Sequence, residues 1–134
     1  MWPLLLAASL SPHFDVTASL AEGKAGPRVA VTFVAKDPDV HVNEEPAPRL
    51  RLDPLQKVLV DKQPPPPARA ASFDPETARY LDLARPVLFP VGLAPGAPRG
   101  TQSVKASVVY FYCSKREGWC RRGSADLNLT VTVP

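Results

Sequence analysis

The chain has 134 residues, of which 45% are hydrophobic and 17 are proline, with 16 basic and 13 acidic residues and a formal net charge of +3. This length suits one domain with a hydrophobic core, and the proline content excludes long uninterrupted helices. The small net charge, without an arginine-rich stripe and interleaved aromatic residues, excludes a dedicated nucleic-acid-binding protein.

The first twelve residues form a separate segment. Leu4–Leu10 is a short apolar run with small residues at Ala7–Ser9, but no Lys or Arg precedes it. A secretory signal normally begins with basic residues, so a signal remnant and a plain first strand or tail both stay open. We place one domain at residues 13–134. No stretch reaches the ~20 apolar residues that span a bilayer, so we expect no transmembrane segment.

Alternating apolar and polar residues predict strands in the first half of the chain. Phe14–Leu20 and Arg28–Ala35 are separated by turn residues and predict a β-hairpin. Val40–Pro46 is expected to be a loop. Arg49–Leu52 alternates again and predicts a short strand, and Gln56–Val60 is a further candidate strand.

Residues 61–79 are expected to be irregular. Pro64–Pro67 is a tetraproline, which favours polyproline II and cannot join a ladder. Asp74 can cap a helix and Pro75 suits its first position, so one or two helical turns are the most we expect. We therefore interpret this segment as a long surface insertion.

The second half of the chain contains the longest predicted strands. Pro86–Leu93 predicts a strand at a sheet edge, because Pro90 lacks an N–H. Ser103–Cys113 and Ser124–Val133 predict two long strands that form the final hairpin. About seven to eight short strands with Pro/Gly turns and little helix indicate an all-β sandwich. In the last strand, alternation predicts these inward-facing residues: Leu127, Leu129, Val131 and Val133.

The two cysteines, Cys113 and Cys120, are the only ones in the chain and fall at the tip of this hairpin. A closing hairpin brings Cα atoms within the ~4.4–6.8 Å that a disulfide needs. The eight-residue loop gives the bond roughly 2.5 kcal/mol of stabilisation by chain entropy. A bond kept oxidised indicates a location outside the cytoplasm. Nearby cations favour the thiolate form: Lys115, Arg116, Arg121 and Arg122.

Three interpretations of the cysteine pair stay open: a structural staple, an exchangeable redox pair and a metal site. Zinc needs four ligands at set spacings, and the only histidines, His13 and His41, do not lie in such a pattern, so we expect no metal and no other cofactor. Phe111 shares the Cys113 side of its strand, where an aromatic ring can shield sulfur, and Trp119 is expected to pack at the rim.

Two further groups of polar residues have ordinary explanations. His41, Asn43, Glu44 and Glu45 cluster in one segment, which is more typical of a solvated loop than of a catalytic base. Asn128-Leu-Thr130 matches a glycosylation acceptor but lies in the middle of a strand. There is no Gly-rich phosphate loop and no Ser-centred nucleophile elbow.

Val109-Tyr-Phe-Tyr-Cys113, then Gly118-Trp-Cys120 and a final alternating strand, resembles a known family. The pattern is similar to the N-terminal periplasmic domain of the thiol:disulfide interchange protein DsbD. It is equally similar to the C-terminal β domain of bacterial NHL-repeat, thioredoxin-like proteins. Val40–Pro46, with its His-x-Asn sequence, fits the same pattern. The resemblance covers residues 14–133 in outline, and its specific part is the cysteine hairpin.

The resemblance implies an immunoglobulin-like sandwich with Cys113 and Cys120 as an exchanging redox pair. It implies a bacterial, periplasmic or secreted module with protein-disulfide reductase-type activity and a thioredoxin-like or membrane redox protein as partner. The alternative is a non-enzymatic immunoglobulin-like binding or accessory domain with a structural disulfide. The spacing between the cysteines is one residue longer than in DsbD, and Arg121–Gly123 replaces a proline-containing segment. The chain contains no electron carrier of its own, so exchange requires a partner.

Overall fold

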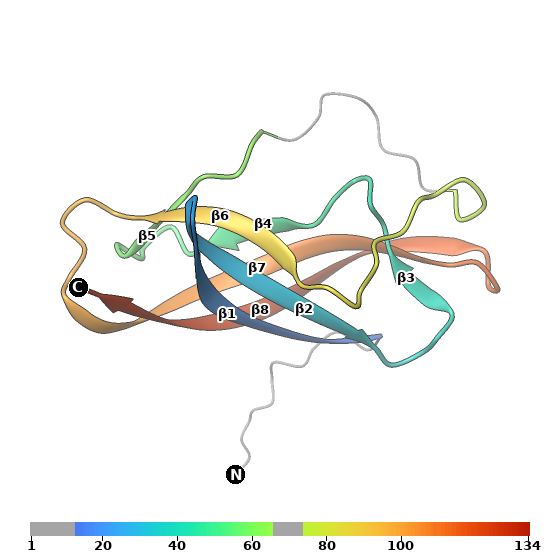
Figure 1. Ribbon diagram of the computed structural model, residues 1–134. Helices are drawn as coiled ribbons and strands as arrows, with labels where there is room; N and C mark the ends of the chain where they lie inside the picture. Colours follow the sequence, from blue (N-terminus) through green and yellow to red (C-terminus); the bar gives the residue numbers. More distant parts are fainter. Residues whose placement is uncertain (1–12, 66–73) are drawn as a thin grey trace, which may run out of the picture.

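The computed structural model describes residues 13–65 and 74–134, and within them it confirms the predicted all-β sandwich (Figure 1). The expectations for residues 1–12 and for Pro66 and Pro67 lie outside the described residues. Eight strands make two antiparallel sheets, and no helix occurs in the described ranges. The strands are β1 (Phe14–Gly23), β2 (Gly26–Ala35), β3 (Val40–Val42), β4 (Arg49–Leu52), β5 (Leu59–Asp61), β6 (Val87–Leu93), β7 (Gly100–Ser114) and β8 (Trp119–Val133).

The strand order is that of an immunoglobulin constant-type sandwich. One sheet has the order β1-β2-β6-β5. In the other, β7 pairs with β8 along one edge, and β3 and β4 follow one another along the opposite edge. If β3 and β4 are counted as one broken strand, the two sheets contain strands A-B-E-D and C-F-G, which is the constant-type arrangement. The long F–G hairpin of this arrangement is β7–β8.

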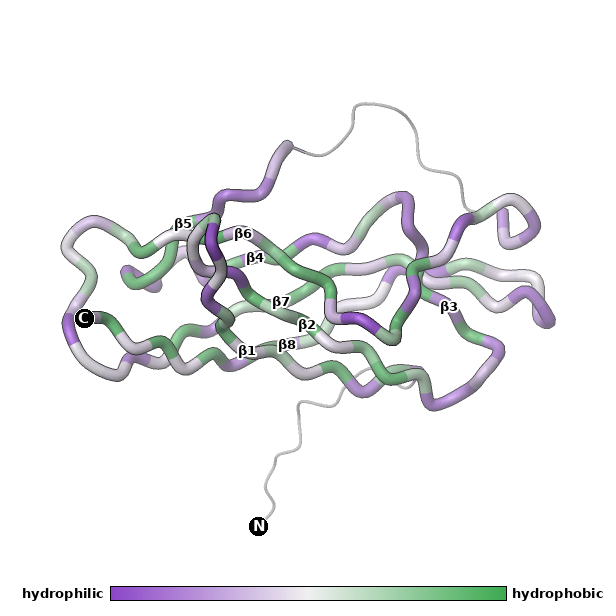
Figure 2. Tube along the Cα trace, in the orientation of Figure 1, coloured by the Kyte–Doolittle hydropathy of each residue, from purple (hydrophilic) through white to green (hydrophobic). Residues whose placement is uncertain are grey.

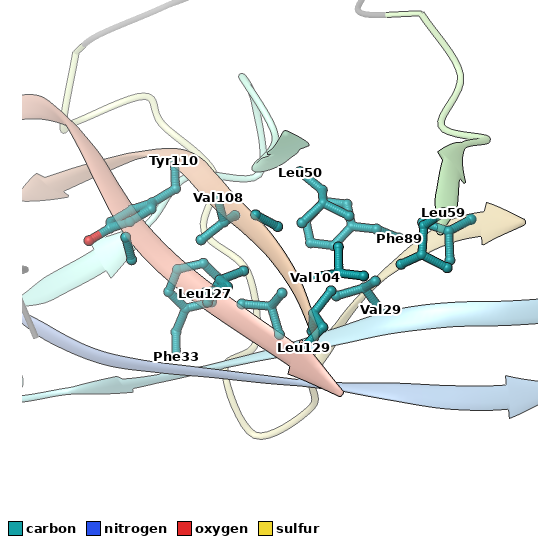
Figure 3. Packing of buried hydrophobic residues seen from close by; sticks show 14 of the residues in the cluster. Val29, Phe33, Leu50, Leu59, Phe89, Val104, Val108, Tyr110, Leu127 and Leu129 are labelled. Atoms are coloured by element: carbon teal, nitrogen blue, oxygen red, sulfur yellow. The ribbon is translucent and has the colours of Figure 1, made fainter. Parts of the chain in front are cut away.

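The core lies between the two sheets and follows from the alternation of the strands. Figure 2 shows hydrophobic and polar positions alternating along β7 and β8. Every second residue of β8 from Ala125 to Val133 is buried, as predicted, while the residues between them are exposed. Figure 3 shows Leu127 and Leu129 of β8 in one cluster with residues of β2 and β6. Labelled members of the cluster include Val29, Phe33, Phe89, Val104, Val108, Leu127 and Leu129.

The prediction that Pro86–Leu93 forms an edge strand is wrong. β6 lies between β2 and β5, and it pairs with them in succession. Val87–Pro90 is registered with β2, and the pairing with β5 begins at the next residue, Val91. Pro90 stands at this changeover, where a missing N–H interrupts neither ladder. Its carbonyl accepts a hydrogen bond from the Lys62 N–H (3.1 Å).

Other local predictions hold with different bounds. The loop predicted at 40–46 is wrong at its start, because β3 pairs there with the end of β7. The candidate strand at 56–60 begins later, as β5, because the Gln56 side chain accepts hydrogen bonds from the N–H groups of Val58 and Leu59. At Asp74 the chain makes a single turn, closed by a bond from the Ala78 N–H (2.9 Å), and no helix follows.

Near the tip of the hairpin, a glycine leaves room for a buried tyrosine ring. Gly123 is registered opposite Tyr110, whose ring is fully buried against Phe14 and Phe33. A Cβ added at Gly123 would lie 2.7 Å from Tyr110 Cζ, which no real contact tolerates. The absent side chain therefore admits the tyrosine ring, and the ladder continues without a break to Cys113 and Cys120.

Candidate functional site

The predicted disulfide joins two directly opposed residues of β7 and β8. Cys113 and Cys120 are partners in the ladder, with Cα atoms 4.0 Å apart and an S–S distance of 2.02 Å. The Cα distance is shorter than the ~4.4–6.8 Å expected of a disulfide, and it is nearest to the ~4.5 Å of the closer of the two kinds of opposed pair in an antiparallel ladder. Both residues point to the outer face of their sheet, opposite to the buried face of β8. Phe111 and Arg122 are the next pair along that face.

The two cysteine residues differ in their exposure to solvent. Cys113 is completely buried, whereas Cys120 is partly exposed. The difference follows from the topology, because β7 is flanked on both sides at this point and β8 has only β7 beside it within its sheet. Of the two cysteines, Cys120 is therefore the one that solvent reaches in part.

His41 lies directly across the ladder from Cys113, on β3. Its ring stacks on Tyr80, with centroids 4.7 Å apart, and Lys115 Nζ lies 5.5 Å from the centroid of the same tyrosine. The pKa of Tyr80 is raised, first by burial and then by the carboxylates of Glu76, Asp39 and Asp74. His41 was expected in a solvated loop, but it is half-buried in a strand beside the disulfide.

Asn43 covers the Cys113 sulfur. Its side chain is fully buried, and its Oδ1 atom lies 3.1 Å from Cys113 Sγ. Its Nδ2 atom is buried without a hydrogen-bond partner among the described residues. The backbone N–H of Asn43 donates to the Phe111 carbonyl (2.7 Å), and Asn43 forms a β-bridge with Tyr80. Residues from β3, β7 and the Tyr80 segment therefore enclose this sulfur.

The turn at the hairpin tip is fastened to a second turn, Asp37–Asp39. The Ser114 hydroxyl donates to an Asp39 carboxylate oxygen, and the Glu117 N–H donates to the same hydroxyl (3.1 Å). Arg116 forms ion pairs with Asp37 (3.7 Å) and Asp39 (3.6 Å). The Ser114 hydrogen bond, with smaller contributions from Arg116, lowers the pKa of the Asp39 carboxyl. These bonds hold the tip from a position some 75 residues away in the sequence.

Trp119 and Arg121 occupy the inner face of the tip rather than the sulfur face. The Trp119 ring lies 5.6 Å from those of both Tyr112 and His13, and the Arg121 guanidinium stacks over it at 4.0 Å. The Trp119 indole N–H donates to Glu117 (2.8 Å). Of the four cations predicted to favour a thiolate, Arg122 shares the outer face with Cys120, while the other three contact different groups: Lys115 the Tyr80 ring, Arg116 two carboxylates and Arg121 the indole.

A groove of about 1070 Å³ is lined by residues of both sheets. Phe111 and Arg122 line its near end, so it stops one outward-facing pair short of the disulfide. Its other walls come from β4 to β6 and their connections, and they include Leu52, Val60 and Leu88. Neither cysteine lines this groove.

Three residues of the site escaped sequence analysis: Asp39, Ser114 and Tyr80. Asp37-Pro-Asp39 is a sequence typical of a turn, but it does not indicate which residue the turn contacts. Nothing in the local sequence pairs Asp39 with Ser114, because that contact depends on the register of β3 against β7. Tyr80 directly follows the segment that was expected to be irregular, and only the folded chain brings it to His41.

Neither a metal centre nor a spanning helix is evident in residues 13–65 and 74–134. No group of three or more His, Cys, Asp or Glu side chains in these ranges could hold a metal ion. No helix in these ranges is long and apolar enough to cross a membrane. Fold and site together define an immunoglobulin-like β-sandwich with a cross-strand disulfide at the tip of its F–G hairpin. Comparison with models of protein families, with curated proteins and with solved structures finds no match.

Proposed function

We propose that this domain is an extracytoplasmic thiol–disulfide exchange module in which Cys113 and Cys120 pass electrons to or from a partner protein. The observation that carries the proposal is the unequal burial of the two cysteines, because Cys113 is buried and Cys120 is partly exposed. Exchange requires one sulfur that a partner can reach and a second that leaves and later returns. The resemblance to the N-terminal domain of DsbD supports the same function.

The exchange begins with attack on Cys120. A thiolate of a reduced dithiol partner forms a bond to Cys120 Sγ, and the Cys113–Cys120 bond breaks. The electron pair of the broken bond remains on Cys113 Sγ, which leaves as a thiolate. The partner's second thiolate then attacks its own sulfur in the mixed disulfide and releases the Cys120 thiolate. The partner dithiol loses two electrons and two protons, and the cysteine pair gains both.

The tip is held in place for this reaction. The Asp37–Asp39 turn fastens the loop between the cysteines, and β3 fixes the strand that carries Cys113. The two sulfurs therefore remain opposed after the bond opens, which favours its reformation. The exposed Arg122 guanidinium on the same face as Cys120 favours the thiolate electrostatically. A thioredoxin-like or membrane redox protein in a bacterial periplasm is the partner that fits this chemistry.

The redox potential tests the proposal. The protein is equilibrated with glutathione buffers of increasing reduced fraction, quenched with an alkylating reagent, and the alkylated thiols are counted by mass. We expect two thiols to appear within the accessible range of buffers, at a potential more oxidising than about −300 mV. The Cys113→Ser/Cys120→Ser double variant is the control and should acquire no label. A bond that stays closed at every practical ratio overturns the exchange function.

Two single-cysteine variants test the order of attack. Cys113→Ser leaves only the exposed thiol, and Cys120→Ser leaves only the buried one. We expect the Cys113→Ser protein to react with an aromatic disulfide reagent at least about tenfold faster, since reactivity follows thiolate access. Equal rates after both variants are shown to be folded would contradict attack at Cys120.

A second candidate is a binding or accessory domain whose disulfide only staples the tip. The observation that favours it is the density of contacts at the tip, where Cys113 is wholly buried and Ser114 and Arg116 tie the loop to Asp39. A staple should resist the glutathione pool and lie below about −300 mV. The same titration therefore separates the two functions.

A further inference from the structure

The buried amide of Asn43 is poorly satisfied beside the closed disulfide. Its Oδ1 atom lies 3.1 Å from Cys113 Sγ, but a sulfur in a disulfide carries no proton to donate. Its Nδ2 atom has no hydrogen-bond partner in the part of the chain that the structure describes. Buried polar groups are almost always paired in native proteins. This side chain therefore lacks the partners that its burial demands while the disulfide is intact.

Reduction supplies the missing partner. A Cys113 thiol can donate its S–H to Oδ1, and a Cys113 thiolate can accept from an N–H of the same amide. A half-turn about the Cβ–Cγ bond exchanges the two ends of the amide, so one side chain serves both protonation states. Carboxamide donors are especially strong towards an ionised acceptor.

We propose that Asn43 is a positioning residue that stabilises the Cys113 sulfur when the disulfide opens and so makes the bond easier to reduce. This inference rests on the proposed exchange function and deepens it. In the first step the electron pair of the broken S–S bond passes to Cys113 Sγ, and the Asn43 amide is the polar group that meets it. The partner thiolate supplies the electron pair of its own new bond to Cys120 Sγ.

The backbone around Asn43 holds the amide in this place. The Asn43 N–H is bonded to the Phe111 carbonyl (2.7 Å), two residues before Cys113. On its other side the chain bridges to Tyr80, where the Glu44 N–H donates to the Arg79 carbonyl (2.7 Å). These backbone bonds fix the Cα of Asn43 beside β7, so the side chain starts from a point close to Cys113.

The ionisable groups around Cys113 are few. His41 faces it from β3, with Tyr80 stacked on the far side of the imidazole. Lys115 comes from the turn and reaches towards Tyr80, and Arg122 comes from β8. Asp39 is engaged with Ser114. Asn43 is the polar side chain in contact with Cys113 Sγ, at 3.1 Å from its Oδ1 atom.

The variant Asn43→Leu tests the inference, with Gln63→Leu as its matched control. Gln63 is a partly buried amide that bonds the backbone N–H and carbonyl of Leu50, away from the disulfide. Each protein is equilibrated with dithiothreitol as well as with glutathione. We expect Asn43→Leu to lower the equilibrium constant for reduction about tenfold, which corresponds to a potential about 30 mV more negative. Gln63→Leu should keep the wild-type potential.

A second variant covers the case in which Asn43→Leu does not fold. Asn43→Asp has the same size, and its carboxylate should oppose a neighbouring thiolate. The Asn43→Asp substitution is made in the Cys120→Ser protein, which leaves Cys113 as the only thiol. We expect it to raise the pKa of the Cys113 thiol by about one unit or more, and thiolate absorbance measured against pH gives this pKa. Unchanged potential in Asn43→Leu, or unchanged thiol pKa in Asn43→Asp, overturns the inference.

The two proposals fail in distinguishable ways. If the wild-type bond resists glutathione, the exchange function fails, but dithiothreitol still measures the difference between wild type and Asn43→Leu. If the bond is exchangeable and that difference is absent, only the role of Asn43 fails.

Discussion

The two ends of the β7–β8 hairpin are built by different means. In the body of the hairpin, alternate residues are buried against the other sheet from Val104 to Val108 in β7 and from Ala125 to Val133 in β8, and the residues between them are exposed or half-buried. At the tip, the buried residues include Ser114 as well as Cys113, with polar Asn43 beside them. The open end is stabilised by apolar area, whereas the tip is stabilised by a covalent bond and individual polar contacts.

The difference shows how one hairpin combines a rigid support with a reactive end. Apolar packing is non-directional and tolerates moderate change. A polar contact demands a particular partner, and its loss leaves a buried group unpaired. We therefore expect variants of the hairpin body to change the free energy of unfolding most, and variants of the tip to change the chemistry of the disulfide most.

The largest expected effect on stability comes from the body. Leu129 is 1% exposed and lies opposite Val104, which is also buried. Leu129→Ala should lower the free energy of unfolding by about 3 kcal/mol, through lost transfer free energy and the cavity that remains. Urea unfolding of the oxidised protein measures this. Asn128→Ala, at the exposed neighbouring position, should change stability by less than about 0.5 kcal/mol. If the two variants cost the same, the body is not held by its buried face.

A smaller effect is expected from the tip. Cys113→Ala/Cys120→Ala opens a loop with a sequence separation of 7. Chain entropy predicts a loss of about 2.5 kcal/mol in the free energy of unfolding. Hydrogen exchange should accelerate at the amides between the two cysteines and stay slow in β7 near Val104 and Val108. Faster exchange along the whole hairpin would show that tip and body unfold together, against the comparison drawn above.

Periodicity explains which parts of this architecture could be predicted. The strands with clean alternation, above all β1, β2, β7 and β8, were placed correctly because one buried face leaves a period of two in the sequence. The edge-strand prediction from Pro90 was wrong, because a missing N–H indicates an edge strand only where the same partner strand continues on that side of the proline. Here the partner changes at that residue.

Of the candidate site, only the Cys113–Cys120 disulfide could be predicted from the sequence. Cys113 and Cys120 are recognised by spacing within a hairpin, but their unequal burial depends on β3, a strand of three residues that alternation alone did not reveal. Asn43 and His41 were noticed as a polar cluster, and their position beside Cys113 follows from the register of β3 on β7. Contacts across 70 or more residues leave no local pattern.

The smallest expected effect concerns Asp39 and the pH dependence of the tip. Its pKa is lowered from 3.8, first by the Ser114 hydrogen bond, so its ionised form is stabilised by folding. Such a group adds stability above its unfolded pKa, and the increment disappears as pH falls through the folded pKa. Asp39→Asn should therefore unfold more easily than wild type at neutral pH, and the two should converge below about pH 3.8.

Urea unfolding at a series of pH values measures this convergence. Asp126→Asn, an exposed carboxylate on the outer face of β8, is the matched control. At neutral pH its free energy of unfolding should differ less from that of wild type, because the substitution removes no contact to Ser114. If the difference in free energy of unfolding between wild type and Asp39→Asn stays constant from neutral to acid pH, Asp39 acts through its shape rather than its charge. The tip would then resemble the body, where packing rather than electrostatics decides stability.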